Sequence, residues 1–183
     1  MFNEGKIERE VPIKAEEKIP EKKSGRVVVE IGPGIAPTTF LHEDVPEVEI
    51  GKDDRYFAVE LDKFKTKSLK RSVDQIGEQH GPDFKSIVMR ADGKQLPFQD
   101  ESVDEIILPN VLNADLSNGE VHKIFDEALR VAKKGGKIII FETYGAANNE
   151  YDNFLIDIKK WPSIKVEEKR GPKFENMYEV TKG

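Results

Sequence analysis

One stretch near the amino terminus restricts the fold of this chain more than any other: an apolar run, an acid, and two glycines one residue apart. Val27–Val29 form an uninterrupted β-branched run, which predicts a strand buried on both faces of a sheet. Gly32 and Gly34 then allow a sharp turn that exposes backbone N–H groups to a ligand. Pro37 suits the first position of a helix, where its missing N–H costs nothing. This order is typical of α/β proteins that bind nucleotide-like cofactors, although an ordinary βα turn without a ligand uses the same residues.

The remaining apolar segments alternate between the periods of strands and helices, which predicts a mostly parallel sheet with helices on both faces. We expect further strands at 56–59, 86–89, 103–108 and 137–141, and a closing antiparallel hairpin from 164–167 and 177–180. Helices are expected at 37–43, 62–79 and 153–161. The most regular helix starts at a capping box of Ser117 and Glu120 and is expected to end with Lys133 and Lys134.

Four polar residues each come just after a predicted strand: Glu30, Glu60, Asp92 and Asn110. Right-handed crossovers bring the carboxyl ends of parallel strands to one edge of the sheet, where α/β proteins bind their ligands. A carboxylate at Glu60 is suited to accept hydrogen bonds from both hydroxyls of a ribose. The alternative is that Glu60 caps the next helix or faces solvent.

Composition limits the possible classes of protein. The 183 residues suit one domain at 26–183, preceded by a charged arm or substrate lid at 1–25. The absence of cysteine excludes disulfides and thiolate metal sites, and no metal site is expected. Without a membrane-spanning run or a signal peptide, the chain is interpreted as soluble and cytoplasmic. The formal charge of −6 disfavours nucleic acid as a partner, so the lysine-rich stretch 63–71 is interpreted as a solvated helix face, with nucleic-acid contact as the alternative.

Several motifs follow one another along the chain. They are Glu30-Ile31-Gly32-Pro33-Gly34, Val59-Glu60-Leu61-Asp62, Ala91-Asp92-Gly93 with Leu96-Pro97-Phe98 and Ser102-Val103-Asp104, and Glu127–Val131 with Lys134-Gly135-Gly136-Lys137. Over about residues 25–183 the chain resembles the class I, Rossmann-like S-adenosylmethionine-dependent methyltransferases. The resemblance implies a three-layer α/β sandwich with a seven-stranded sheet whose last strand is antiparallel. Ala36 and Pro37 depart from the family's glycine-rich pattern, and the short first helix is a second departure.

The resemblance also implies S-adenosyl-L-methionine as the cofactor and a role for each motif. The turn Gly32-Pro33-Gly34 would lie against the methionine moiety, and Glu30 would hold the ammonium group directly or through water. Glu60 would bind the ribose hydroxyls, with Leu61 beside it. Asp92 would accept from the adenine amino group, with Gly93 leaving room, and Asn110 would border both cofactor and substrate.

The sequence says less about the methyl acceptor and the catalytic base. His42, His80 and His122 are poorly placed as bases, and Asn110, Tyr144 and Tyr151 flank the expected crevice. Methylation of base carbons usually needs a cysteine, and Pro109-Asn110-Val111 does not resemble the motif of enzymes that methylate nucleic-acid amino groups. A small-molecule acceptor is therefore expected. Two alternatives stay open: a non-catalytic binding or scaffold module, and a nicotinamide-dependent oxidoreductase whose third glycine would fall at Pro37.

Overall fold

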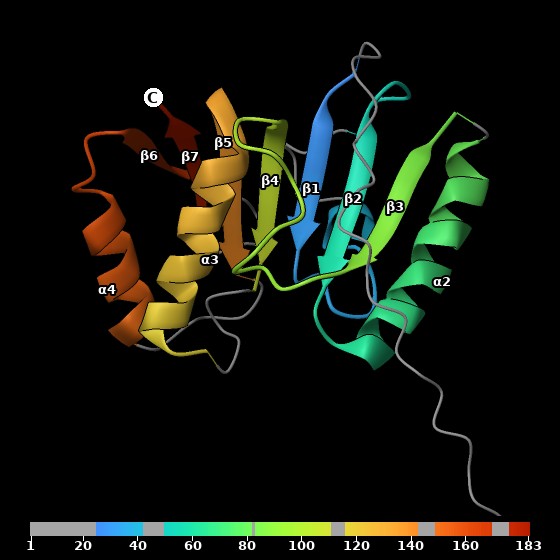
Figure 1. Ribbon diagram of the computed structural model, residues 1–183, viewed down its shortest axis with the longest axis horizontal. Coiled ribbons are helices and arrows are strands. Elements are labelled where there is room, and N and C mark those ends of the chain that lie inside the picture. The colour runs from blue at the N-terminus through green and yellow to red at the C-terminus, as the bar shows by residue number, and fades with distance from the viewer. Residues whose placement is uncertain (1–24, 42–49, 82, 111–115, 143–148, 170–175) are drawn as a thin grey trace, which may run out of the picture.

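The computed structural model describes residues 25–41, 50–81, 83–110, 116–142, 149–169 and 176–183. The strands are β1 (Val27–Ile31), β2 (Arg55–Glu60), β3 (Lys85–Arg90), β4 (Val103–Pro109), β5 (Ala132–Glu142), β6 (Ile164–Lys169) and β7 (Asn176–Lys182). The helices are α1 (Thr38–Leu41), α2 (Lys63–His80), α3 (Asn118–Val131) and α4 (Asn149–Ile158). The described strands form one seven-stranded sheet in the order β3-β2-β1-β4-β5-β7-β6 (Figure 1). Strands β1 to β5 run parallel, and β7 is antiparallel to β5 and β6, which confirms the predicted fold class.

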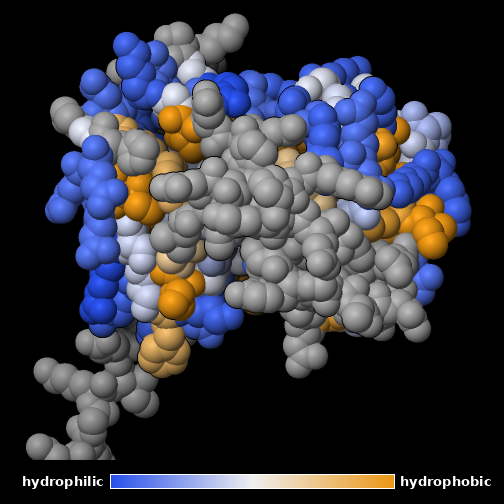
Figure 2. All heavy atoms as spheres, turned by 180° about the vertical axis from the view of Figure 1, so that it is seen from behind, coloured by the Kyte–Doolittle hydropathy of each residue, from blue (hydrophilic) through white to orange (hydrophobic). Residues whose placement is uncertain are grey.

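The central strand β1 is buried on both faces, as its uninterrupted apolar sequence predicts. Val27 and Val29 join the core beneath α3 and α4, whereas Val28 joins the core beneath α2. Burying a valine fully stabilises the fold by about 1.5–3 kcal/mol, so this strand anchors both layers. Seen from behind, the outer margins of the molecule are largely hydrophilic (Figure 2).

Local signals set the helix starts. The carboxylate of Asp62 accepts hydrogen bonds from the N–H groups of Phe64 and Lys65, both at 2.8 Å, so α2 begins one residue later than expected. At the start of α3, the N–H and hydroxyl of Ser117 both donate to the carboxylate of Glu120, at 3.2 and 2.9 Å. Each of these side chains satisfies polar groups that the first turn leaves without an intrahelical partner.

The carboxyl end of α3 corrects one expectation. The helix ends at Val131, so the prediction that Lys133 and Lys134 form its last turn is wrong. Ala132 already pairs with Val103 of β4, and this pairing draws the chain out of helical geometry before the two lysines. Lys133 forms an ion pair instead, with its Nζ 2.6 Å from a carboxylate oxygen of Asp104.

The connection between β3 and β4 contains no helix and crosses one face of the sheet (Figure 1). It buries Leu96 and Phe98, and the Phe98 ring meets the Phe57 ring of β2 edge to face, with centroids 5.3 Å apart. The guanidinium of Arg130 donates to the carbonyls of Leu96 and Phe98, at 3.2 and 3.0 Å. A loop held by one arginine of α3 therefore covers this part of β2.

The carboxyl ends of the parallel strands meet at one edge of the sheet, the lower edge in Figure 1. The order of the strands reverses between β1 and β4, and such a reversal is where open α/β sheets bind their ligands. Residues 1–24, nearly all of the expected arm, lie outside the described residues, so the domain boundary stays a prediction. No helix in the described ranges is long and apolar enough to cross a membrane.

Candidate active site

The turn after β1 lies against the end of β2. Gly32 and Gly34 both have positive φ angles, 74° and 75°, which glycine adopts without a steric penalty. The N–H of Gly32 donates to the carbonyl of Val59 at 2.8 Å, and this bond continues the β1–β2 pairing into the turn. A Cβ atom built on Gly34 would meet nothing within 4 Å, so the backbone at this glycine faces open space. The backbone at Gly34 is therefore open to close approach by a ligand. The expectation that the two glycines expose their N–H groups is wrong, because Gly32 donates to Val59 and Gly34 donates to Glu60.

Glu60, at the end of β2, is in direct contact with this turn. One carboxylate oxygen accepts the N–H of Gly34 at 3.0 Å, and the other accepts the N–H of Asp62 at 2.9 Å. Each oxygen keeps acceptor capacity beyond that single bond. Glu60 is 7% exposed, whereas the next residue, Leu61, is 55% exposed at the same rim. The structure thus brings together the predicted glycine turn and the predicted ribose acid.

Glu30 lies beneath the turn and is fully buried. Its carboxylate accepts the N–H of Thr38 and the hydroxyl of Thr39, both at 2.8 Å, together with the hydroxyl of Tyr56. Burial raises the pKa of Glu30, and these hydrogen bonds oppose that rise. The carboxylate therefore ties the end of β1 to the start of α1, and its assignment to a cofactor ammonium group stays a prediction.

Asp92 and Gly93 follow β3 and reach the same edge. The N–H of Ala91 donates to the carbonyl of Glu60 at 3.3 Å, so this loop continues beside the end of β2. The Asp92 side chain is 40% exposed and lies 3.8 Å from the ammonium of Lys94. A Cβ atom on Gly93 would sit 3.0 Å from Cγ2 of Ile31, tighter than ordinary contact. Gly93 thus lets the loop pack on β1, and the side chain of Ile31 occupies the room that glycine leaves.

Asn110 directly follows β4, on the side of β1 away from β2. It has a φ angle of 51°, a left-handed conformation that asparagine tolerates better than most residues. Its N–H donates to the carbonyl of Phe141 in β5 at 2.9 Å. Because β4 adjoins β1 on the side away from β2, Asn110 lies at the reversal of strand order, opposite Glu60 across the end of β1.

Neither His80 nor His122 lies at this edge, in line with the expectation that they are poorly placed as bases. The His122 ring packs in α3 between Phe154 and Trp161, with centroid separations of 5.1 and 6.2 Å. His80 is the last residue of α2, at the opposite end of that helix from Glu60. His42 and Tyr144 lie outside the described residues, as does the side chain of Tyr151.

Two residues form hydrogen bonds in the candidate site that were not expected from the sequence. The Tyr56 hydroxyl bonds Glu30, and the Lys94 ammonium joins the Asp92 loop to Glu120 of α3 at 3.0 Å. Tyr56 carried a usable signal, since a tyrosine inside a buried strand needs a hydrogen-bond partner. Lys94 carried none, because a lysine in a polar loop is ordinarily solvated.

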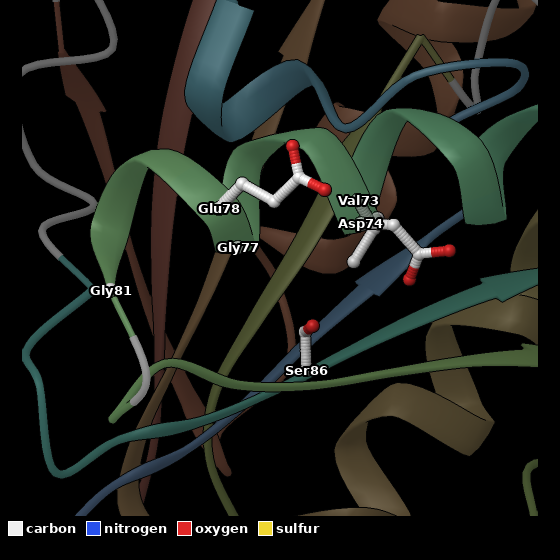
Figure 3. A pocket seen from close by; sticks show the side chains of 6 residues that line it. All are labelled: Val73, Asp74, Gly77, Glu78, Gly81 and Ser86. Carbon is white, nitrogen blue, oxygen red and sulfur yellow. The ribbon is translucent and has the colours of Figure 1, made fainter.

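A shallow groove elsewhere does not belong to this site. It lies between α2 and the start of β3 and is lined by Val73, Asp74, Gly77, Glu78, Gly81 and Ser86 (Figure 3). Ser86 points from β3 toward the helix, while the carboxylates of Asp74 and Glu78 extend along α2. This is the amino end of β3, away from Glu60 and the glycine turn. Among the described residues, no group of three or more metal-ligating side chains gathers here or elsewhere.

Comparison with known proteins identifies the family. The family model of the methyltransferase domain matches residues 31–140, which is more than half of the chain. The chain belongs to this methyltransferase family. The matched residues include the glycine turn as well as Glu60, Asp92 and Asn110. No protein with curated function matches the chain in sequence.

Solved structures of two methyltransferases share the fold. The S-adenosylmethionine-dependent methyltransferase of Aquifex aeolicus is 17% identical with a TM-score of 0.58, covering 87% of this chain and 82% of its own. An S-adenosylmethionine-dependent methyltransferase from Methanosarcina mazei is 14% identical with a TM-score of 0.55, covering 87% of this chain and 92% of its own. At such identities the likeness shows a common architecture.

Proposed function

We propose that this methyltransferase uses S-adenosyl-L-methionine as its methyl donor. The observation that carries the proposal is the contact between the Glu60 carboxylate and the N–H of Gly34. The Glu60 carboxylate can accept hydrogen bonds from the two hydroxyls of a ribose, and the backbone at Gly34 is open. Both lie at the edge where α/β sheets bind nucleotide-like ligands. Neither feature alone specifies an adenosine compound, but their combination fits one.

The residues present fit the parts of this cofactor. The open backbone at Gly34 suits the methionine moiety, with Gly32 and Pro33 completing the turn. Glu60 retains acceptor capacity for the ribose hydroxyls, and the exposed side chain of Leu61 offers apolar surface next to it. Asp92 and Gly93 lie beyond Glu60, where a partly exposed carboxylate suits an adenine amino group.

Glu30 and Asn110 complete the proposed set with different roles. A direct bond from Glu30 to the cofactor's ammonium group would require a side-chain movement or a bridging water, because its carboxylate already accepts three hydrogen bonds in a fully buried position. Asn110 is proposed to border cofactor and acceptor, since it directly follows β4 at the reversal of strand order.

When bound, S-adenosylmethionine supplies an electrophilic methyl group on a positively charged sulfur. The protein then needs to hold the acceptor in line with the methyl carbon, and such positioning is worth several kcal/mol. We propose a small-molecule acceptor that is nucleophilic without a strong base, since no histidine with a described side chain lies at this edge. The absence of cysteine excludes a cysteine-dependent base methylation and suits a reducing cytoplasm, where we place the reaction.

Calorimetric titration with S-adenosylmethionine, S-adenosylhomocysteine and a nicotinamide dinucleotide tests the proposal. We expect binding of the two sulfur compounds and none of the dinucleotide. Binding of the dinucleotide alone would indicate an oxidoreductase. Binding of none of them would overturn the enzymatic proposal and favour a binding or scaffold module.

A further inference from the structure

The amino-terminal half of α2 carries a dense group of exposed cations. Five side chains within nine residues are exposed to solvent: Lys63, Lys65, Lys67, Lys70 and Arg71. Within the described part of the chain, none of these five side chains forms an ion pair or a hydrogen bond. By contrast, Lys94, Lys133 and Lys160 each lie within 3.0 Å of a carboxylate oxygen. We call these five residues and Phe64 the α2 surface.

The positive charges of the α2 surface destabilise the helix that carries them. The amino end of a helix is electropositive, and a cation in its first turn is unfavourable. The first turn of α2 contains no acid and begins with Lys63. Lys63 and Lys67, and then Lys67 and Arg71, are like charges four residues apart, a spacing that also destabilises a helix. Where a sequence breaks local rules without a gain in stability, a function is the expected reason.

The nearest carboxylate, that of Asp62, offsets only part of the positive charge of this surface. Asp62 directs one carboxylate oxygen to the N–H groups of Phe64 and Lys65 and serves as the helix cap. The hydrogen bond from the Lys65 N–H, with the charges of Lys65 and Arg90, lowers the pKa of Asp62. Within residues 62–71 there are five cations and one acid, which leaves this stretch locally positive on a chain whose formal charge is −6. Arg90 adds a further exposed cation beside it and donates to the carbonyl of Leu61 at 3.1 Å. An anionic partner would find complementary charge at this face.

The exposed ring of Phe64 indicates which class of anionic partner fits this surface. Its side chain is 83% exposed in the middle of the cations, where an aromatic ring has no contribution to the core. Lysines interleaved with an exposed aromatic ring match the requirements of single-stranded nucleic acid, whose phosphates pair with cations and whose bases stack on rings. From behind, the side of the molecule formed by α2 is an almost continuous hydrophilic column, with hydrophobic residues exposed near the end where the helix begins (Figure 2).

Two other partners fit less well. A membrane surface needs a free apolar helix face, but Leu69 and Val73 of α2 are 0% and 2% exposed and pack against the sheet. A protein interface is depleted of lysine at its centre, whereas lysine dominates here. We propose that the α2 surface binds single-stranded RNA through its phosphates, with Phe64 stacking on a base. This binding does not depend on the proposed cofactor or acceptor.

Fluorescence anisotropy with a labelled single-stranded RNA of about 12 nucleotides, without cofactor, tests the proposal. Engagement of about three cations predicts a loss of roughly 20-fold in affinity between about 50 and 200 mM salt. The variant Lys67→Glu/Arg71→Glu should lose at least about tenfold. Its matched control, Lys123→Glu/Lys134→Glu, reverses two exposed lysines outside α2 and should stay close to the parent protein. Both variants change the formal charge by the same four units, from −6 to −10.

Phe64→Ala separates stacking from charge. It should weaken RNA binding by roughly fivefold or more and leave the binding of inorganic polyphosphate unchanged. Equal losses in the two charge-reversal variants would overturn the proposal, as would an unchanged RNA affinity in Phe64→Ala. Binding to phosphatidylserine vesicles or to polyglutamate with no binding to RNA would also overturn it and assign the surface to a membrane or to an acidic protein.

Discussion

The carboxylate of Glu60 and the N–H of Gly34 lie 3.0 Å apart, although 26 positions separate them in the sequence. The parallel pairing of β1 with β2 produces this proximity, because Ile31 and Val59 are register partners at the ends of the two strands. The hydrogen bond holds the glycine turn open before any ligand arrives. Preorganisation of this kind lowers the entropic cost of binding.

The first prediction concerns Glu60. Glu60→Ala should weaken the binding of S-adenosylhomocysteine by about 1–3 kcal/mol, or roughly 5- to 150-fold, because charge-assisted hydrogen bonds to the ribose would be lost. Isothermal titration calorimetry measures the change. Glu78→Ala, at the groove near the start of β3, is the control and should bind like the parent protein. An unchanged affinity in Glu60→Ala would remove this residue from the cofactor site.

The second prediction compares two glycines. Gly93→Ala should lower the free energy of unfolding by about 1–3 kcal/mol, because its Cβ would press on Cγ2 of Ile31 at 3.0 Å. Gly119→Ala is the matched control: its Cβ meets nothing within 4 Å, and alanine favours the helix by up to about 1 kcal/mol. Urea denaturation of both variants distinguishes them. Equal stabilities would mean that the Asp92 loop relaxes away from β1.

Much of the fold was predictable because its signals are local. The run Val27–Val29, the capping box at Ser117 and the alternation of strands with helices each depend on nearby residues, and the structure confirms them. The end of α3 was not predictable in this way. It depends on the pairing of Ala132 with Val103, a contact between residues far apart in the sequence that no helical pattern reveals.

The candidate site was likewise predictable only where its signals are local. The strand ends predicted that Glu60 and Asp92 share an edge, and the backbone bond from Ala91 to Glu60 places their loops side by side. The sequence did not predict which groups would surround the buried Glu30. Its partners Thr38 and Tyr56 lie on different elements, and a carboxylate needs such donors only once the fold has excluded water.

The third prediction follows from the buried acid. Burial raises the pKa of Glu30 above its unfolded value, so its contribution to stability is complete below the unfolded pKa and is lost as pH rises through the folded pKa. Glu30→Gln should lower the free energy of unfolding by about 1–3 kcal/mol near pH 5, because the amide of glutamine offers one acceptor oxygen where the carboxyl group of Glu30 offers two to its three donors. The loss should shrink toward about pH 8. Urea denaturation across this range checks it, with the exposed Glu78→Gln as control, and a loss that grows with pH would contradict the prediction.

The fourth prediction concerns the ion pair between the Asp92 loop and α3. The hydrogen bond from the Lys94 ammonium, with further bonds from Ser117, lowers the pKa of Glu120 to about 2. The stability from this lowered pKa is present above the unfolded value and is lost as pH falls from about 4.5 toward 2. Lys94→Met should raise the pKa of Glu120, which NMR titration of its carboxyl carbon measures. Lys123→Met, on the exposed side of α3, should leave that pKa unchanged.

Arg130 fastens the connection between β3 and β4 at its middle, through the carbonyls of Leu96 and Phe98. This attachment divides one long loop into two short spans that are anchored independently. An insertion or deletion in the second span, between Phe98 and β4, would therefore be absorbed without shifting Asp92. Relatives of this chain can accordingly diverge in the length of that span while the opposite end of the connection keeps its geometry.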